Sequence, residues 1–157
     1  MFPVRSILWP SDGSENAFKA LEAAAEIAVR FSADIHALQV VHQVPTVVGA
    51  GFSPVAVKGF DVPLYEQELL RSAEEELKQT LQVKLPEEVK ASAHVIVGIP
   101  SDEIVLFAQN NSIDLIVMAT HGRTGISRFM LGSVAEKTIR QSTIPTLVIP
   151  VKETAND

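Results

Sequence analysis

The stretch Leu115-Ile-Val-Met-Ala-Thr-His-Gly-Arg-Thr-Gly-Ile-Ser-Arg-Phe-Met-Leu-Gly-Ser133 decides the fold of this 157-residue chain. Its first residues, 115–119, are all apolar, which predicts a short strand that is buried on both faces. A loop with glycines follows, and Gly132-Ser133 opens a helix that is predicted to end near Gln141. Such a succession of buried strand, glycine loop and helix is typical of a parallel sheet covered by helices.

Similar apolar runs, separated by amphipathic stretches, make up most of the chain. Because an exposed sheet face would require alternating polar residues, these continuous runs predict parallel strands that are covered on both sides. The predicted strands are Val4–Trp9, Ile35–Val41, Ala93–Val97, Leu115–Ala119 and Pro145–Ile149. The predicted helices are Ser14–Phe31, Leu64–Val83, Ser101 to about Asn110 and Gly132 to about Gln141, with Ser14 and Ser101 as N-caps.

We therefore expect one α/β domain over residues 1–157, built on a single doubly wound, five-stranded parallel sheet. The segment Gln43–Phe60 contains three glycines and two prolines and has no clear period, which predicts a long loop. The polar residues from about 152 onward are expected to form a frayed tail.

Composition excludes several classes of protein and site. The chain has no cysteine, so disulfides, thiolate zinc sites and cysteine nucleophiles are excluded. The net charge of −6 opposes non-specific binding to nucleic acids or anionic lipids. The sequence shows neither a signal peptide nor an apolar run near the ~20 residues of a membrane span. We expect a cytoplasmic protein with no nucleic-acid and no membrane partner.

The charge is unevenly distributed along the chain. Between Ala119 and Arg140 there are four basic residues and one acidic residue, a local net charge of +3. All other residues together carry −9. A small basic segment in an acidic protein predicts a pocket for one anion rather than a track for nucleic acid.

The ligand site of such a sheet is expected at the carboxyl ends of the strands, where the strand order reverses. The first strand usually lies beside that reversal, so the loop after Trp9 is predicted to form one wall of the crevice. The loop after Ala119 is predicted to form the other wall.

The loop after Ala119 contains the parts of a phosphate cradle. Gly122, Gly125 and Gly132 permit backbone conformations and close approaches that a side chain would block. The N–H groups at Gly132-Ser133 lie at the positive end of the last helix. Arg123 and Arg128 could add charged contacts, although an ordinary glycine loop with solvated arginines is the alternative.

Three further side chains near these loops each admit two interpretations. Ser133 and Glu136 match the capping box, so Ser133 either caps the last helix or contacts a phosphate. Asp12 could hydrogen-bond a ribose hydroxyl or help to hold a phosphate-bound Mg²⁺, and it could equally be a turn or cap residue. His121 has no second ligand at metal-binding spacing, which favours ordinary hydrogen bonding, so neither a metal site nor a catalytic residue is predicted.

Three stretches of the sequence, taken together, resemble the universal stress protein family. The resemblance runs along nearly the whole chain. The three stretches are Ile7-Leu-Trp-Pro-Ser-Asp-Gly-Ser-Glu15, the glycine loop and Ile144-Pro-Thr-Leu-Val-Ile149. The resemblance implies a UspA-like domain with strand order 3-2-1-4-5, an arrangement that is adenine nucleotide alpha hydrolase-like and Rossmann-like. It also implies binding of ATP or AMP, a homodimer and a role in stress survival.

The ATP-binding members of that family carry Gly, two residues, Gly, nine residues, then Gly-Ser or Gly-Thr. In this chain Ala119 stands at the first glycine position, while Gly122 and Gly132-Ser133 fill the others. By resemblance, Asp12 contacts the ribose, Val40 meets the adenine and the N–H of Val134 binds phosphate. The implied nucleotide-binding residues are Pro10, Ser11, Asp12, Val40, Ala119, Thr120, His121, Gly122, Arg123, Thr124, Gly125, Gly132, Ser133 and Val134.

Three classes of function remain open at this point. The first is a cytoplasmic homodimeric module that binds an adenine nucleotide, and the second is a stress-associated scaffold whose crevice is empty or holds another small anion. The third is an enzyme, either a weak ATPase or a kinase-like protein, but the chain lacks a Walker A lysine motif, a pyrophosphatase loop and a nucleophile elbow.

The homodimer is expected to form through the strand at 145–149, because an apolar edge strand is usually covered or paired. A monomer whose edge is covered by its own tail or by Gln43–Phe60 is the alternative.

Overall fold

The structure is a computed structural model that describes residues 3–42, 62–121 and 131–151. Within these segments five strands alternate with four helices, in the expected order along the chain. They are β1 (Ser6–Ser11), α1 (Glu15–Phe31), β2 (Asp34–Val41), α2 (Val62–Lys84), β3 (Ala91–Val97), α3 (Pro100–Asn110), β4 (Leu115–Ala119), α4 (Ser133–Gln141) and β5 (Thr146–Ile149). The predicted loop Gln43–Phe60 and the tail from about 152 lie outside the described residues.

All five strands form one parallel sheet in the order β3-β2-β1-β4-β5, which confirms the predicted fold class and strand order. β1 lies in the middle of the sheet. Its residue Ile7 pairs with Ile35 of β2 on one side and with Leu115 of β4 on the other. The chain therefore runs outward from β1 to β3, then returns to add β4 and β5, so the order reverses beside β1.

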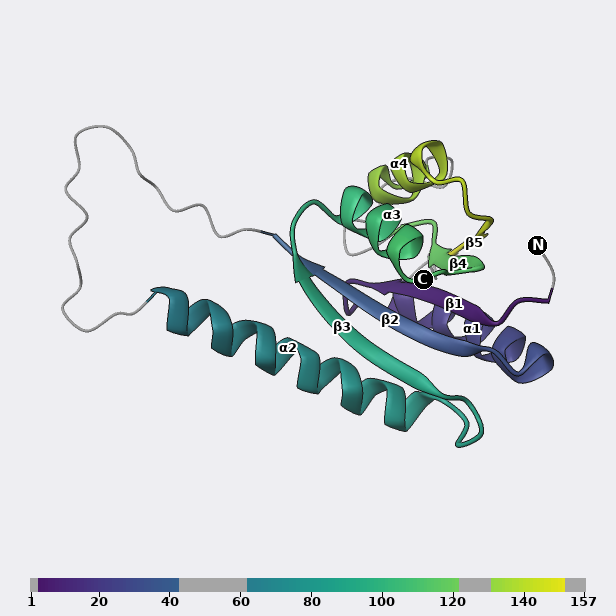
Figure 1. Ribbon diagram of the computed structural model, residues 1–157, viewed down its shortest axis with the longest axis horizontal. Helices are drawn as coiled ribbons and strands as arrows, with labels where there is room; N and C mark the ends of the chain where they lie inside the picture. The colour runs from purple at the N-terminus through teal and green to yellow at the C-terminus, as the bar shows by residue number, and fades with distance from the viewer. Residues whose placement is uncertain (1–2, 43–61, 122–130, 152–157) are drawn as a thin grey trace, which may run out of the picture.

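Two pairs of helices cover the two faces of this sheet (Figure 1). The helices α1 and α2 pack on one face, where Leu21, Leu77 and Leu81 belong to one buried cluster. The helices α3 and α4 pack on the other face, which holds the second cluster. Consecutive strand residues point to opposite faces, and both Ile116 and Val117 are fully buried. This explains why β4 has no polar alternation.

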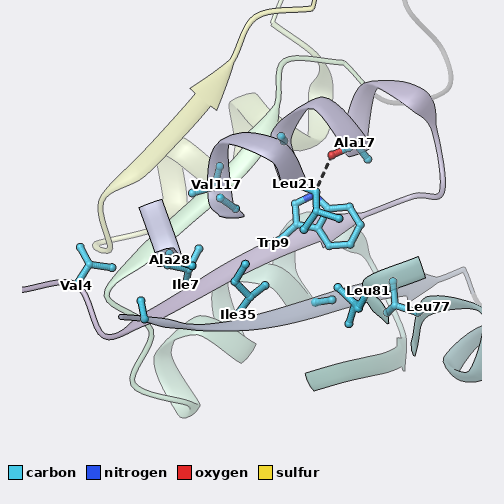
Figure 2. Packing of buried hydrophobic residues seen from close by; sticks show 14 residues of the cluster. Val4, Ile7, Trp9, Ala17, Leu21, Ala28, Ile35, Leu77, Leu81 and Val117 are labelled. Carbon is cyan, nitrogen blue, oxygen red and sulfur yellow. Dashed lines mark hydrogen bonds between the residues drawn. The ribbon is translucent and has the colours of Figure 1, made fainter. Parts of the chain in front are cut away.

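The first cluster is built around the indole of Trp9, which is fully buried beneath α1 (Figure 2). Its Nε1–H donates a 2.9 Å hydrogen bond to the carbonyl oxygen of Ala17, so the one polar atom of the ring is satisfied. The helix α1 begins where predicted, because Ser14 is the N-cap and its hydroxyl accepts the N–H of Ala17.

The predicted N-cap role of Ser101 is wrong. The N-cap of α3 is Ile99, whose side chain makes no cap hydrogen bond. Pro100 occupies the first helical position, where its missing N–H costs nothing and its fixed φ suits a helix. Ser101 consequently lies one position inside the helix and is 2% exposed.

Asp114 joins the amino ends of β1 and β4, at the opposite edge from the expected crevice. Its Oδ2 accepts the backbone N–H groups of Arg5 and Ser6 at 2.8 and 3.0 Å. Its own N–H donates to the carbonyl oxygen of Ser6. No helix in the described ranges combines the length and apolarity required to cross a bilayer.

Candidate functional site

A cavity of about 650 Å³ opens at the carboxyl ends of β1, β2 and β4, beside the point where the strand order reverses. This volume lies within the range of sites that enclose small molecules and cofactors. The residues predicted from the sequence that line it are Pro10, Ser11, Asp12, Val40, Ala119, Thr120, His121, Gly132, Ser133 and Val134. The other four predicted residues, Gly122, Arg123, Thr124 and Gly125, lie outside the described residues.

The sequence reasoning missed part of the lining. The end of β2 contributes Gln39, Val41 and His42, and the start of α3 contributes Ile99, Pro100 and Ser101. Each of these segments lies at or just after the carboxyl end of a predicted strand. That position is the sequence signal that could have identified them as lining residues. Further lining comes from Ala17, Leu38, Ile104, Met118, Ala135 and Lys137.

One wall of the cavity is apolar. Leu38, Ile104, Met118 and Ala135 belong to the buried cluster beneath α3 and α4, and they also line the cavity. Val40 packs at the edge of the same cluster. An apolar wall of this kind suits a flat aromatic ring.

Asp12 lies on the β1 side of the cavity in a hydrogen-bonded turn. Its Oδ1 accepts the N–H of Ser14 at 3.0 Å, and Gly13 adopts φ 75° in the same turn. The hydroxyl of Ser11 accepts the N–H of Gly13 at 3.2 Å. The turn role that the sequence left open is therefore present, and it holds the carboxylate at the cavity wall.

On the opposite side, Gly132 brings the start of α4 against the end of β4. Its N–H donates to the carbonyl oxygen of Thr120 at 2.8 Å. A Cβ atom built on Gly132 would lie 2.6 Å from that same oxygen. No side chain fits there, so this close approach requires glycine.

Of the two interpretations left open for Ser133, the capping box with Glu136 is wrong. The N-cap of α4 is Gly132, which makes no side-chain cap hydrogen bond, and Ser133 is the first helical residue. Glu136 does not reach back to the helix start, because its Oε1 accepts Nε of Arg140 at 3.1 Å. Within the described ranges, the N–H groups of Ser133, Val134 and Ala135 therefore have neither an intrahelical acceptor nor a capping side chain.

The starts of α1 and α3 at the same edge of the sheet are arranged differently. The start of α1 is capped by Ser14. At the start of α3, the side chain of Glu103 folds back against Gly98, where its Oε1 would be 2.6 Å from an added Cβ. This places a negative charge beside the amino end of α3. At the start of α4 no described side chain caps the helix, and its first-turn carboxylate, Glu136, is paired with Arg140, so this is the corner suited to an anion.

His121 lies between these walls and is only partly satisfied. Its Nδ1 is 3.1 Å from the hydroxyl of Thr120. Its Nε2 is buried and has no hydrogen-bond partner among the residues that the structure describes. In the described segments no group of three or more metal-ligating side chains could hold a metal ion.

Ala119, which replaces a glycine of the ATP-binding pattern, is the last residue of β4 and pairs with Ile149. Among the described non-glycine residues, positive φ occurs at Ser32 and Ser112, and not at Ala119. Its methyl group therefore introduces no backbone strain.

Comparisons with known proteins agree with this architecture. The model of the universal stress protein family matches residues 3–150. Universal stress protein MJ0531 of Methanocaldococcus jannaschii is 36% identical over 151 residues, which is 95% of this chain and 85% of that protein. The structure of the universal stress protein UspA from Lactobacillus plantarum shares 25% identity, with a TM-score of 0.73, over 95% of this chain and 99% of that one.

A more distant structure shares the fold and contains a ligand. It is the universal stress protein from Archaeoglobus fulgidus in complex with dAMP, which is 21% identical with a TM-score of 0.55. The alignment covers 95% of this chain and 99% of that chain. The family match over nearly the whole chain and the 36% identity to MJ0531 show that this chain belongs to the universal stress protein family.

Proposed function

We propose that this protein is a cytoplasmic, homodimeric stress-response module that binds an adenine nucleotide, ATP or AMP, in the cavity beside β1. The observation that carries the proposal is the uncapped start of α4, which faces the same cavity as the carboxylate of Asp12 and an apolar wall. An anion, a hydroxyl-bearing sugar and a flat ring are the three parts of a nucleotide. A relative of the same fold was solved with dAMP, which is also an adenine nucleotide.

In the proposed complex the phosphates lie at the α4 corner, where the N–H groups of Ser133 and Val134 donate to them. The carboxylate of Asp12 accepts a ribose hydroxyl, and the adenine lies against Val40. Pro10, Ser11, Thr120 and His121 complete the walls. Gly122, Arg123, Thr124 and Gly125, which lie outside the described residues, are also part of the proposed nucleotide-binding set. A Mg²⁺ ion would bind together with the phosphates, and the carboxylate of Asp12 would help to hold it.

The variant Ser133→Pro tests the phosphate corner with little damage to the helix. Proline is favoured at the first helical position, and Gly132 already has φ −60° and ψ 149°, a conformation that proline tolerates in the preceding residue. The substitution removes one N–H donor. Since a hydrogen bond to a charged group contributes roughly 1.5–3 kcal/mol, we expect about tenfold or greater loss of nucleotide affinity by calorimetric titration. Ser133→Ala, which keeps the N–H, is the matched control and should retain the affinity that Ser133→Pro loses.

The wild-type protein provides the first measurement. A ligand at a hundredfold excess over its Kd stabilises the folded state by about 2.7 kcal/mol, which raises Tm by several degrees in a domain of this size. Mass spectrometry of small molecules released from freshly purified protein should also identify an adenine nucleotide. If millimolar ATP and AMP, each with Mg²⁺, leave Tm unchanged and no nucleotide is released, the cavity does not bind nucleotides and the scaffold alternative stands.

A further inference from the structure

The charged residues of α4 are not equivalent. Glu136 and Arg140 lie one turn apart and form an ion pair, with 3.0 Å between Oε1 and the Nη2 nitrogen of the guanidinium. Lys137 lies between them in the sequence and has no ion pair or hydrogen bond in the described part of the chain. Of these three side chains, Lys137 alone lines the cavity. The guanidinium of Arg140 is therefore paired with a carboxylate of the same helix, whereas Lys137 lies at the cavity.

The position of Lys137 on α4 places it above the anion corner. It follows Ser133 by four residues, so the two side chains lie on the same helix face, one turn of about 5.4 Å apart. Helical side chains lean toward the amino end of their helix, so the stem of Lys137 runs back toward Ser133. Its ammonium group can reach an anion beyond the one held by the first-turn N–H groups.

The charges around the cavity make this residue important for a highly charged ligand. Among the lining residues that the structure describes, Asp12 is the only carboxylate and Lys137 is the only lysine or arginine. Without Lys137 this lining would carry one uncompensated negative charge. Coulomb energy scales with the product of the charges, so the loss would affect a triphosphate more than a monophosphate and would not affect a neutral nucleoside.

We infer that Lys137 is a specificity-determining residue that makes the cavity favour adenine nucleotides with more than one phosphate over AMP. This inference rests on the proposed nucleotide site. The first phosphate is held by the start of α4, and the ammonium of Lys137 contacts the phosphates beyond it. The opposing view is a solvated surface lysine whose stem merely covers the cavity rim.

The test compares Lys137→Gln with Arg140→Gln. Both variants remove one positive charge from α4 at an exposed site, but Arg140 does not line the cavity. Calorimetric titrations measure Kd for adenosine, AMP and ATP at low and at physiological salt, and Tm of the unliganded variants checks folding. For Lys137→Gln we expect about tenfold weaker ATP binding, about threefold or less for AMP and no change for adenosine, since charged hydrogen bonds contribute roughly 1.5–3 kcal/mol. Arg140→Gln should match the wild type, and Lys137→Arg should retain the preference for ATP.

The outcomes separate this inference from the proposed function. If wild-type protein binds none of the three ligands, both ideas fail. If wild-type protein binds ATP and Ser133→Pro weakens it, but Lys137→Gln binds ATP like the wild type, only the inference is wrong. Equal losses for Lys137→Gln and Arg140→Gln would also overturn it, because they would reveal long-range charge rather than contact with the phosphates.

Discussion

At the residue scale, Gly132, which lines the cavity, can be compared with Gly98, which directly precedes the lining residue Ile99. A Cβ on either glycine would approach another atom to 2.6 Å, but the atoms differ in kind. At Gly132 it is the carbonyl oxygen of Thr120, which belongs to the backbone after β4. At Gly98 it is the side chain of Glu103, which can rotate away.

Gly132→Ala should therefore be much more harmful than Gly98→Ala. Forcing extra atoms into a tight site costs roughly 1–3 kcal/mol when the neighbours cannot move aside. We expect a loss of that size for Gly132→Ala in urea unfolding, with weaker nucleotide binding because the start of α4 shifts. Gly98→Ala should stay within about 0.5 kcal/mol of the wild type, the range of ordinary surface substitutions. Similar losses for the two variants would mean that the contact with Thr120 is not decisive.

A second prediction at this scale concerns Ala119. Because Ala119 ends β4 without positive φ, glycine offers no conformational advantage there. We expect Ala119→Gly to bind ATP with the affinity of the wild type and to be slightly less stable when unliganded, since glycine loses more backbone entropy on folding. A clear gain in affinity by calorimetry would show instead that the methyl group obstructs the ligand.

At the scale of elements, Asp114 illustrates how two strands are held in register by one side chain. Its carboxylate accepts N–H groups from Arg5 and Ser6 at the amino end of β1, while Asp114 itself directly precedes β4. Asp114→Ala leaves the partly buried N–H of Ser6 without this acceptor, which costs about 1–3 kcal/mol. Asp114→Asn keeps one amide oxygen as acceptor and should lose less. Urea midpoints of the two variants, with unchanged m-values, provide the measurement.

The pairing of β2 with β3 contains a pH-sensitive cluster on the face covered by α3. The hydroxyl of Ser92 lies 3.1 Å from Nδ1 of His36 and 2.9 Å from Nε2 of His94. The two imidazole rings stack with centroids 5.7 Å apart, and the ring of Phe107 from α3 lies against both. Burial lowers the pKa of His94 and the neighbouring charge of His36 lowers it further, while Glu74 of α2 opposes the shift.

This lowered pKa has a definite consequence for stability. Below the ordinary histidine pKa of 6.5, the unfolded chain takes up a proton at His94 that the folded protein does not yet bind. The contribution of His94 to the free energy of unfolding is therefore full above pH 6.5, falls as the pH drops through that value, and stops falling below the folded pKa. Urea unfolding between pH 8 and pH 5 should show this decline, and His94→Gln should flatten it. An identical pH profile for the variant would assign the decline to other groups.

At the scale of the whole molecule, the sheet has edges at β3 and β5. In β5, Leu147 is 38% exposed, whereas Val148 packs against the buried cluster beneath α3 and α4. An apolar edge strand invites pairing with another chain, and two copies related by a two-fold axis can pair β5 with itself in antiparallel fashion. We propose this contact as the dimer interface.

Leu147→Lys tests the interface without disturbing the core, which a charge at Val148 would do. The new lysine would lie near its own copy across the two-fold axis, so we expect half the wild-type mass by light scattering and an unchanged circular dichroism spectrum. A wild-type monomer at micromolar concentration, or a variant that retains the dimer mass, would exclude this interface.

The sequence by itself determined the order and type of the elements, because periodic apolar patterns and caps depend on neighbours a few residues away. The apolar run Leu115–Ala119 and the N-cap at Ser14 are examples, and no predicted boundary differs from the observed one by more than two residues. The sequence also predicted a crevice at the carboxyl ends of β1 and β4, where the structure has a cavity. What only the tertiary structure decided are contacts between distant segments. The contact between Gly132 and the carbonyl oxygen of Thr120 fixes the start of α4, which has no capping box. Packing also brings Gln39, Ile99 and Lys137 to one cavity. Such contacts depend on how the helices cross the sheet, and no local pattern records that geometry.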